Sequence, residues 1–153
     1  MNKEFDAALD AIATNHVTAV AQARRDAAAA QAATDKFNLA WQACRTAVVM
    51  PTLNEIAAKL TARQMGAHVG QVDVVGVALY LPGGPDARLG QHNHPTLKIR
   101  PQPHGGGSGS IVFTQNYGQG DGSESYTVEN VTRELIEQES LKLVRRVYGK
   151  NER

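Results

Sequence analysis

The stretch KEFDAALDAIATNHVTAVAQARRDAAAAQAATDKFNLAWQACRTAVV, Lys3 to Val49, decides the fold, because it contains neither glycine nor proline and carries one row of side chains at helical spacing. The row advances by alternating steps of three and four residues, with one extra four-residue step between Ala19 and Ala27, as in a stutter of a heptad repeat. Its members are Phe5, Leu9, Ile12, His16, Ala19, Ala23, Ala27, Ala30, Thr34, Phe37, Trp41, Cys44 and Val48. This pattern predicts a long helical arm whose alanines let a partner helix approach closely.

The predicted arm is longer than the domain that carries it. An unbroken helix from Phe5 to Val48 would be about 65 Å long at ~1.5 Å per residue, whereas a compact domain of this chain length has a diameter near ~40 Å. Either the helix folds back on its own domain, with a break at Thr34 and Asp35, or it pairs with a helix of another chain. Because the row keeps its phase through Thr34, we expect a coiled coil that forms a homo-oligomer, most simply a dimer. The expected interface consists of Phe5, Leu9, Ile12, His16, Ala19, Ala23, Ala27, Ala30, Phe37 and Trp41.

The composition changes near residue 67, since every proline except Pro51 and every glycine except Gly66 lies beyond it. This change predicts an α+β fold with an oligomerisation arm over 1–50 and an α+β domain over 51–153. Pro51 is expected to kink or break the helix, because its ring clashes with the preceding turn. The residues TLNE from Thr52 match a capping box, so a second helix is predicted over 53–66.

The rest of the domain predicts a small antiparallel meander of three or four strands and a C-terminal helix. Residues 72–81 are apolar or small apart from Asp73, which is typical of a central strand covered on both faces. Further strands are predicted at about 95–101, 110–117 and 124–128. A helix over 129–148 follows, with acidic residues in its first part and basic residues in its last, the order that the helix dipole favours.

The sharpest candidate for chemistry is a histidine group. His92 and His94 lie two residues apart, so in an extended chain both rings leave the same face and suit a divalent transition metal, with His104 or Asp86 as a third ligand. The pair resembles the His-x-His pair of the cupins, but Lys98 stands where a carboxylate ligand would be expected and too few strands are available to close a barrel. The alternative is that residues 91–95 form a polar surface loop before an edge strand.

Charge and composition argue against several other classes of protein. The formal net charge of +1 gives no overall basic field, so nucleic-acid binding is not expected. The first six residues carry two acids and no apolar block follows them, unlike a secretory signal, and no run of about eighteen apolar residues predicts a membrane span. Cys44 is the single cysteine, which suits a reducing compartment. We therefore expect a cytoplasmic protein with no membrane contact.

No catalytic signature stands out. The chain has no Gly-x-Ser-x-Gly elbow and no His-Glu-x-x-His helix, and the glycine-rich run at 105–110 lacks the lysine and following helix of a phosphate-binding loop. We expect a non-enzymatic structural or adaptor protein that self-associates through the N-terminal helix, binds a protein partner and needs no cofactor. The alternative is a small metal-binding enzyme or sensor that uses His92, His94 and His104.

Overall fold

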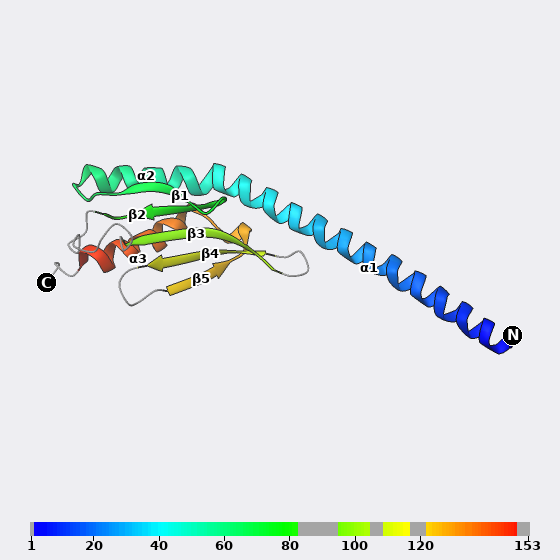
Figure 1. Cartoon of the computed structure of the whole chain (residues 1–153). Coiled ribbons are helices and arrows are strands. Elements are labelled where there is room, and N and C mark those ends of the chain that lie inside the picture. Colours follow the sequence, from blue (N-terminus) through cyan, green and yellow to red (C-terminus); the bar gives the residue numbers. More distant parts are fainter. Residues whose placement is uncertain (1, 83–94, 105–108, 117–121, 150–153) are drawn as a thin grey trace.

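The computed structural model of the protein describes residues 2–82, 95–104, 109–116 and 122–149. In chain order the elements are α1 (Lys3–Cys44), the π-helical turn η1 (Arg45–Val49), α2 (Met50–Ala62), β1 (His68–Val72), β2 (Gly76–Tyr80), β3 (Thr96–Pro103), β4 (Gly109–Asn116), β5 (Gly122–Tyr126), the 3-10 turn η3 (Val128–Asn130) and α3 (Arg133–Tyr148). Figure 1 shows α1 and α2 as one long rod beside the sheet. The predicted α+β class is confirmed, with a long N-terminal helix, an antiparallel sheet and a C-terminal helix.

The sheet has five strands in the order β1-β2-β3-β4-β5, not the three or four predicted, because the segment 72–81 contains a tight turn. β1 and β2 pair antiparallel, with Val72 opposite Gly76. Between them Asp73 has a positive φ of 54°, and Val74 is 81 % exposed at the tip of the turn. The prediction of a single central strand there was wrong, because valines continue through the turn and the hydrophobic pattern therefore shows no interruption.

Pro51 lies within the rod, and the irregularity predicted near it takes the form of the π-helical turn. The backbone N–H of Met50 donates to the carbonyl oxygen of Arg45, five residues earlier, which is the π-helical pattern. Pro51 then follows in the first turn of α2, where a missing N–H is tolerated. The wider turn before it replaces the break that the proline ring would otherwise enforce.

The predicted capping box at the start of α2 does not form. No side chain caps this helix, because the backbone is already helical on both sides of Thr52, which is buried. The carboxylate of Glu55 instead pairs with Arg133 of α3 at 2.5 Å. This ion pair joins the two helices that cover the sheet.

α2 ends in a Schellman motif in which Gln64 takes the left-handed conformation, with a φ of 62°. The N–H of Met65 donates to the carbonyl oxygen of Leu60 at 2.9 Å, and the N–H of Gln64 donates to that of Thr61 at 3.0 Å. These two bonds satisfy carbonyl groups that the helix end would leave unpaired. The helix therefore ends at Ala62, before Gly66, where the predicted helix ends.

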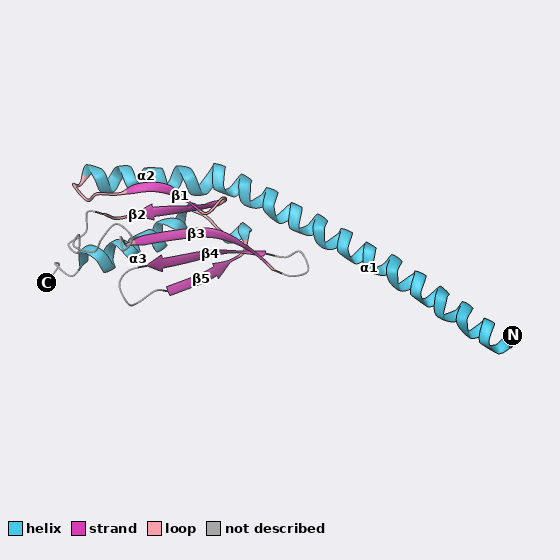
Figure 2. Ribbon diagram, in the orientation of Figure 1, coloured by secondary structure: helices cyan, strands magenta, loops and turns pink. Residues whose placement is uncertain are grey.

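The core lies between one face of the sheet and a layer made by α2, α3 and the C-terminal end of α1 (Figure 2). The strand register places apolar side chains on this face, since Leu79 lies opposite Leu97 and Ile99 lies opposite Phe113. The most deeply buried large side chains are Trp41, Val49, Leu53, Val77, Leu79, Leu81, Leu97, Ile99, Ile111, Phe113, Ile136 and Leu143.

Candidate functional site

The N-terminal part of α1 projects from the domain and has no cover within the described residues (Figure 1). Between residues 2 and 29 every residue except the half-buried Val20 is exposed. Phe5, Leu9 and Ile12 are 55 %, 51 % and 65 % exposed, and they share one side of the helix because they are spaced by four and three residues. We call these three side chains the apolar row of the arm.

The remaining residues of the predicted interface divide at the point where α1 meets the sheet. Exposed in the arm are His16, Ala19, Ala23 and Ala27, and Ala30 is partly buried. Phe37 and Trp41 are instead buried in this chain's own core. The part of the predicted interface that this chain leaves largely uncovered therefore runs from Phe5 to Ala30.

Two contacts fix the base of the arm on the sheet. Trp41 is 1 % exposed, and its indole Nε1 donates a hydrogen bond to the main-chain carbonyl oxygen of Val75 at 3.0 Å. The ring of Phe37 lies against Gly109 at the start of β4. The direction of the projecting helix is set by this pair of aromatic side chains.

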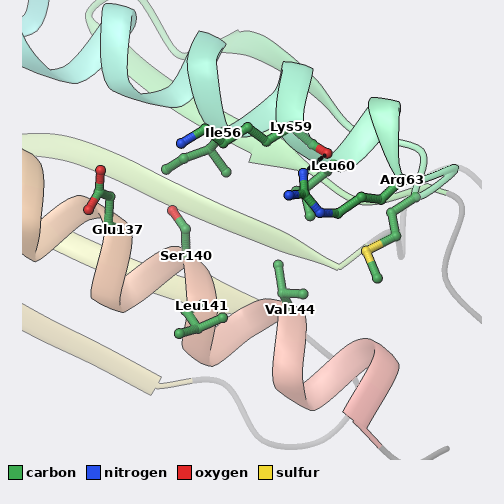
Figure 3. A pocket seen from close by; sticks show the side chains of 9 residues that line it. Ile56, Lys59, Leu60, Arg63, Glu137, Ser140, Leu141 and Val144 are labelled. Carbon is green, nitrogen blue, oxygen red and sulfur yellow. Dashed lines mark hydrogen bonds between the residues drawn. The ribbon is translucent and has the colours of Figure 1, made fainter.

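A groove between α2 and α3 is the second surface with the features of a binding site. Its volume is about 430 Å³, and Figure 3 shows side chains of both helices pointing into it. The apolar side chains that line it are Ile56, Leu60, Met65, Leu141 and Val144. Leu141 is 47 % exposed, so the groove opens to the surface. One signal of it is present in the sequence, because the apolar residues of the C-terminal helix occupy more than one narrow face of that helix.

Ser140 lies in this groove with an unsatisfied hydroxyl group. Its side chain points from α3 towards α2 (Figure 3), it is only 2 % exposed, and its Oγ has no hydrogen-bond partner among the described residues. A buried hydroxyl left unpaired costs about 1–3 kcal/mol.

The rim of the groove is basic along α2 and acidic along α3. Lys59 pairs with Glu55 at 3.3 Å. The guanidinium of Arg63 donates to the main-chain carbonyl oxygen of Lys59 at 2.8 Å, and no carboxylate pairs with it in the part of the chain that the structure describes. On α3, Glu137 is neutralised by Arg133 at 2.9 Å. The rim therefore offers a cation, Arg63, that can accept an acidic partner.

A buried polar network joins α3 to β4 and β5, and sequence reasoning missed it. The carboxylate of Glu139 accepts hydrogen bonds from Lys142 at 2.9 Å and from the Tyr126 hydroxyl at 3.3 Å, while Gln115 donates to the main-chain carbonyl oxygen of Glu139 at 3.2 Å. The Tyr126 hydroxyl also bonds to Glu124. This bond and, after it, burial raise the pKa of Tyr126. The network holds α3 on the sheet.

The histidine group lies mostly outside the described residues, since these do not include His92, His94 or Asp86. The third predicted ligand, His104, follows β3, and its Nε2 lies 3.0 Å from the hydroxyl oxygen of Ser110 on β4. Within the described ranges no group of three His, Cys, Asp or Glu side chains could hold a metal ion. The metal site therefore stays a prediction.

Cys44 is half-buried beside η3, with its Sγ 4.0 Å from the main-chain carbonyl oxygen of Val131. Burial raises the pKa of its thiol. A thiol that is less ionised than usual is a poor nucleophile, so Cys44 acts as a packing residue.

Comparisons with known protein families, with curated proteins and with solved structures find no match. Among the described helices, none combines the length and the apolar character that crossing a bilayer requires. The exposed arm and the α2–α3 groove are the two candidate binding surfaces of the described residues.

Proposed function

We propose that this protein is a non-enzymatic structural or adaptor protein that self-associates through the projecting part of α1. The observation that carries the proposal is the apolar row, in which Phe5, Leu9 and Ile12 are all more than half exposed on a helix that no other described element covers. Burying side chains of this size contributes roughly 1.5–3 kcal/mol each before the cost of ordering them. Covering the apolar row with a partner surface would therefore contribute substantial favourable free energy to association.

The helical state of the arm supports the same proposal. From Asn2 to Ala29 the helix receives almost no tertiary support from its own chain, although most helical stability in proteins comes from the packing of an apolar face. The alanines of the arm favour helix intrinsically. We infer that a second chain supplies the missing packing and that the assembled state, most simply a homodimer, is the working form.

Self-association would place two α+β domains in one particle. A pair of identical domains binds a repeated or extended partner more tightly than one domain does, because the second contact becomes intramolecular. This is the sense in which we propose an adaptor: the arm assembles the particle, and the domains carry its binding surfaces.

The test is the solution mass of the chain and of two matched variants. We expect light scattering at micromolar concentration to give a mass above that of the monomer for the natural chain, and the monomer mass when Phe5, Leu9 and Ile12 are all replaced by glutamate. The control carries glutamates on the opposite side of the same helix, at Ala7, Thr14 and Ala21, and should keep the natural mass. A strictly monomeric natural chain would contradict the proposal.

A further inference from the structure

We infer that the surface that receives the arm is the α2–α3 groove of a second copy of this chain. The inference rests on the proposed self-association and names the site at which it occurs. Three observations lead to it: the position of the two surfaces on the rod, the spacing of their charges, and the composition of the groove.

The geometry of the rod excludes contact between an arm and the groove of the same chain. α1, η1 and α2 follow one another without a break, with the apolar row near one end and the groove beside the other (Figure 1). Phe5 and Leu60 are separated by roughly 80 Å along this rod at ~1.5 Å per residue. An arm can therefore fill a groove only on another molecule.

The charges beside the two surfaces are opposite and equally spaced. Asp6 and Asp10 each follow a residue of the apolar row directly, so they lie along one side of it, four residues apart. Lys59 and Arg63 on α2 are also four residues apart and line the rim of the groove, which gives both pairs a spacing of about 6 Å. With the arm antiparallel to α2, Asp6 meets Arg63 when Asp10 meets Lys59. In the described part of the chain Arg63 has no carboxylate of its own, so this pairing supplies one.

The groove itself suits the edge of an amphipathic helix. Its floor is apolar, its volume of about 430 Å³ takes a short row of side chains and not a whole helix, and helix-in-groove recognition uses anchors at the spacing of Phe5, Leu9 and Ile12. Antiparallel docking is also reciprocal: each chain offers one arm and one groove, so two copies close into a twofold dimer without leaving a free site.

The first experiment separates this inference from the proposed function by altering the groove and leaving the arm intact. Leu141→Glu places a charge at the open edge of the groove, and Val74→Glu is the matched control because Val74 is an exposed apolar residue at the distant β1–β2 turn. We expect sedimentation equilibrium to show a dimer dissociation constant that is raised at least about tenfold by Leu141→Glu and unchanged by Val74→Glu, with circular dichroism confirming that both variants fold. If the arm variant is monomeric while Leu141→Glu remains fully dimeric, the inference is wrong and the arms pair with one another, although self-association stands.

The second experiment exchanges the charges of the two predicted ion pairs. Its result depends on whether the combined variant restores binding, and not on the folding of any single variant. Lys59→Glu with Arg63→Glu should weaken the dimer about tenfold, since like charges then face each other. Asp6→Lys with Asp10→Lys should do the same, and the two pairs combined in one chain should restore the natural dissociation constant to within about threefold. Additive losses without restoration would overturn the proposed register.

Discussion

The ring of Phe37 lies directly on the backbone of Gly109, so that a Cβ added to Gly109 would come within 2.6 Å of its ring carbons. This contact joins the base of the arm to the first residue of β4. Because Phe37 is buried and its neighbours are packed, the ring cannot move aside without disturbing the core. The glycine is required here by close approach, not by backbone conformation.

Gly109→Ala should therefore destabilise the fold. Overpacking of a well-packed core costs about 1–3 kcal/mol, and we expect a loss of that size in the free energy of unfolding measured by urea titration. Gly122→Ala at the start of β5 is the control, because a Cβ there would meet nothing within 4 Å. Equal stability of the two variants would show that the Phe37 ring does not pack against the backbone of Gly109 as described.

Gln64→Gly should stabilise the protein. Gln64 holds a φ of 62°, and the left-handed conformation costs a residue with a side chain about 1–2 kcal/mol. Part of this gain is lost to the more flexible unfolded chain, so we expect a net increase of about 0.5–1 kcal/mol in the free energy of unfolding. As a control, Ala58→Gly changes an exposed residue inside α2 and should lower stability by about 1 kcal/mol. A loss of stability in Gln64→Gly would contradict the Schellman motif.

The ion pair between Glu55 and Arg133 should make stability depend on pH in the acid range. The hydrogen bond from Arg133 and then that from Lys59 lower the pKa of Glu55 below its ordinary value. The folded chain therefore binds this proton less readily than the unfolded chain. The stabilisation is complete above the ordinary carboxyl pKa and disappears as pH falls through the lowered one.

Replacing Glu55 with glutamine removes this titrating group. We expect the plot of unfolding free energy against pH to be flatter for Glu55→Gln than for the natural chain between about pH 5 and pH 3. Glu4→Gln is the control, because Glu4 is exposed near the tip of the arm and should leave the slope unchanged. Identical slopes for Glu55→Gln and the natural chain would mean that the pair is not maintained in solution.

The predicted metal site is tested by elemental analysis of the purified protein. If self-association is the function, metal should be well below one equivalent per chain, and His92→Ala with His94→Ala should change neither the metal content nor the oligomeric mass. One equivalent of zinc, nickel, copper or iron that is lost in the double variant would instead establish the metal-binding alternative.

Much of the fold could be predicted from periodicity. The long helix from Lys3, the C-terminal helix and the half-exposed strands carry clear patterns, because each presents one apolar face. The turn at Asp73 could not be predicted, since Val74 and Val75 continue the strand pattern through a segment that leaves the sheet. Pro51 marks an irregularity in the long helix, but the sequence does not show that it takes the form of a π-helical turn and not of a kink or break.

The candidate surfaces were less predictable, for a different reason. Periodicity shows that Phe37 and Trp41 share a row with Phe5, but it cannot show whether each side chain is covered by its own chain or by another. The groove depends on the distance between α2 and α3, and the unpaired hydroxyl of Ser140 depends on the packing around it. Both are properties of tertiary structure that no single segment encodes.

The π-helical turn at Arg45–Val49 also sets how the preceding helix, α1, is rotated about its own axis. One residue turns an α-helix by about 100°, so if the same residues were wound as a regular α-helix, the whole N-terminal segment would be rotated by roughly that angle about its axis. Phe5, Leu9 and Ile12 would then point in a different direction from the helix axis, although none of these residues had changed. The five residues of η1 therefore determine the direction in which the arm presents its apolar row. They do so from a distance of about 60 Å, at ~1.5 Å per residue.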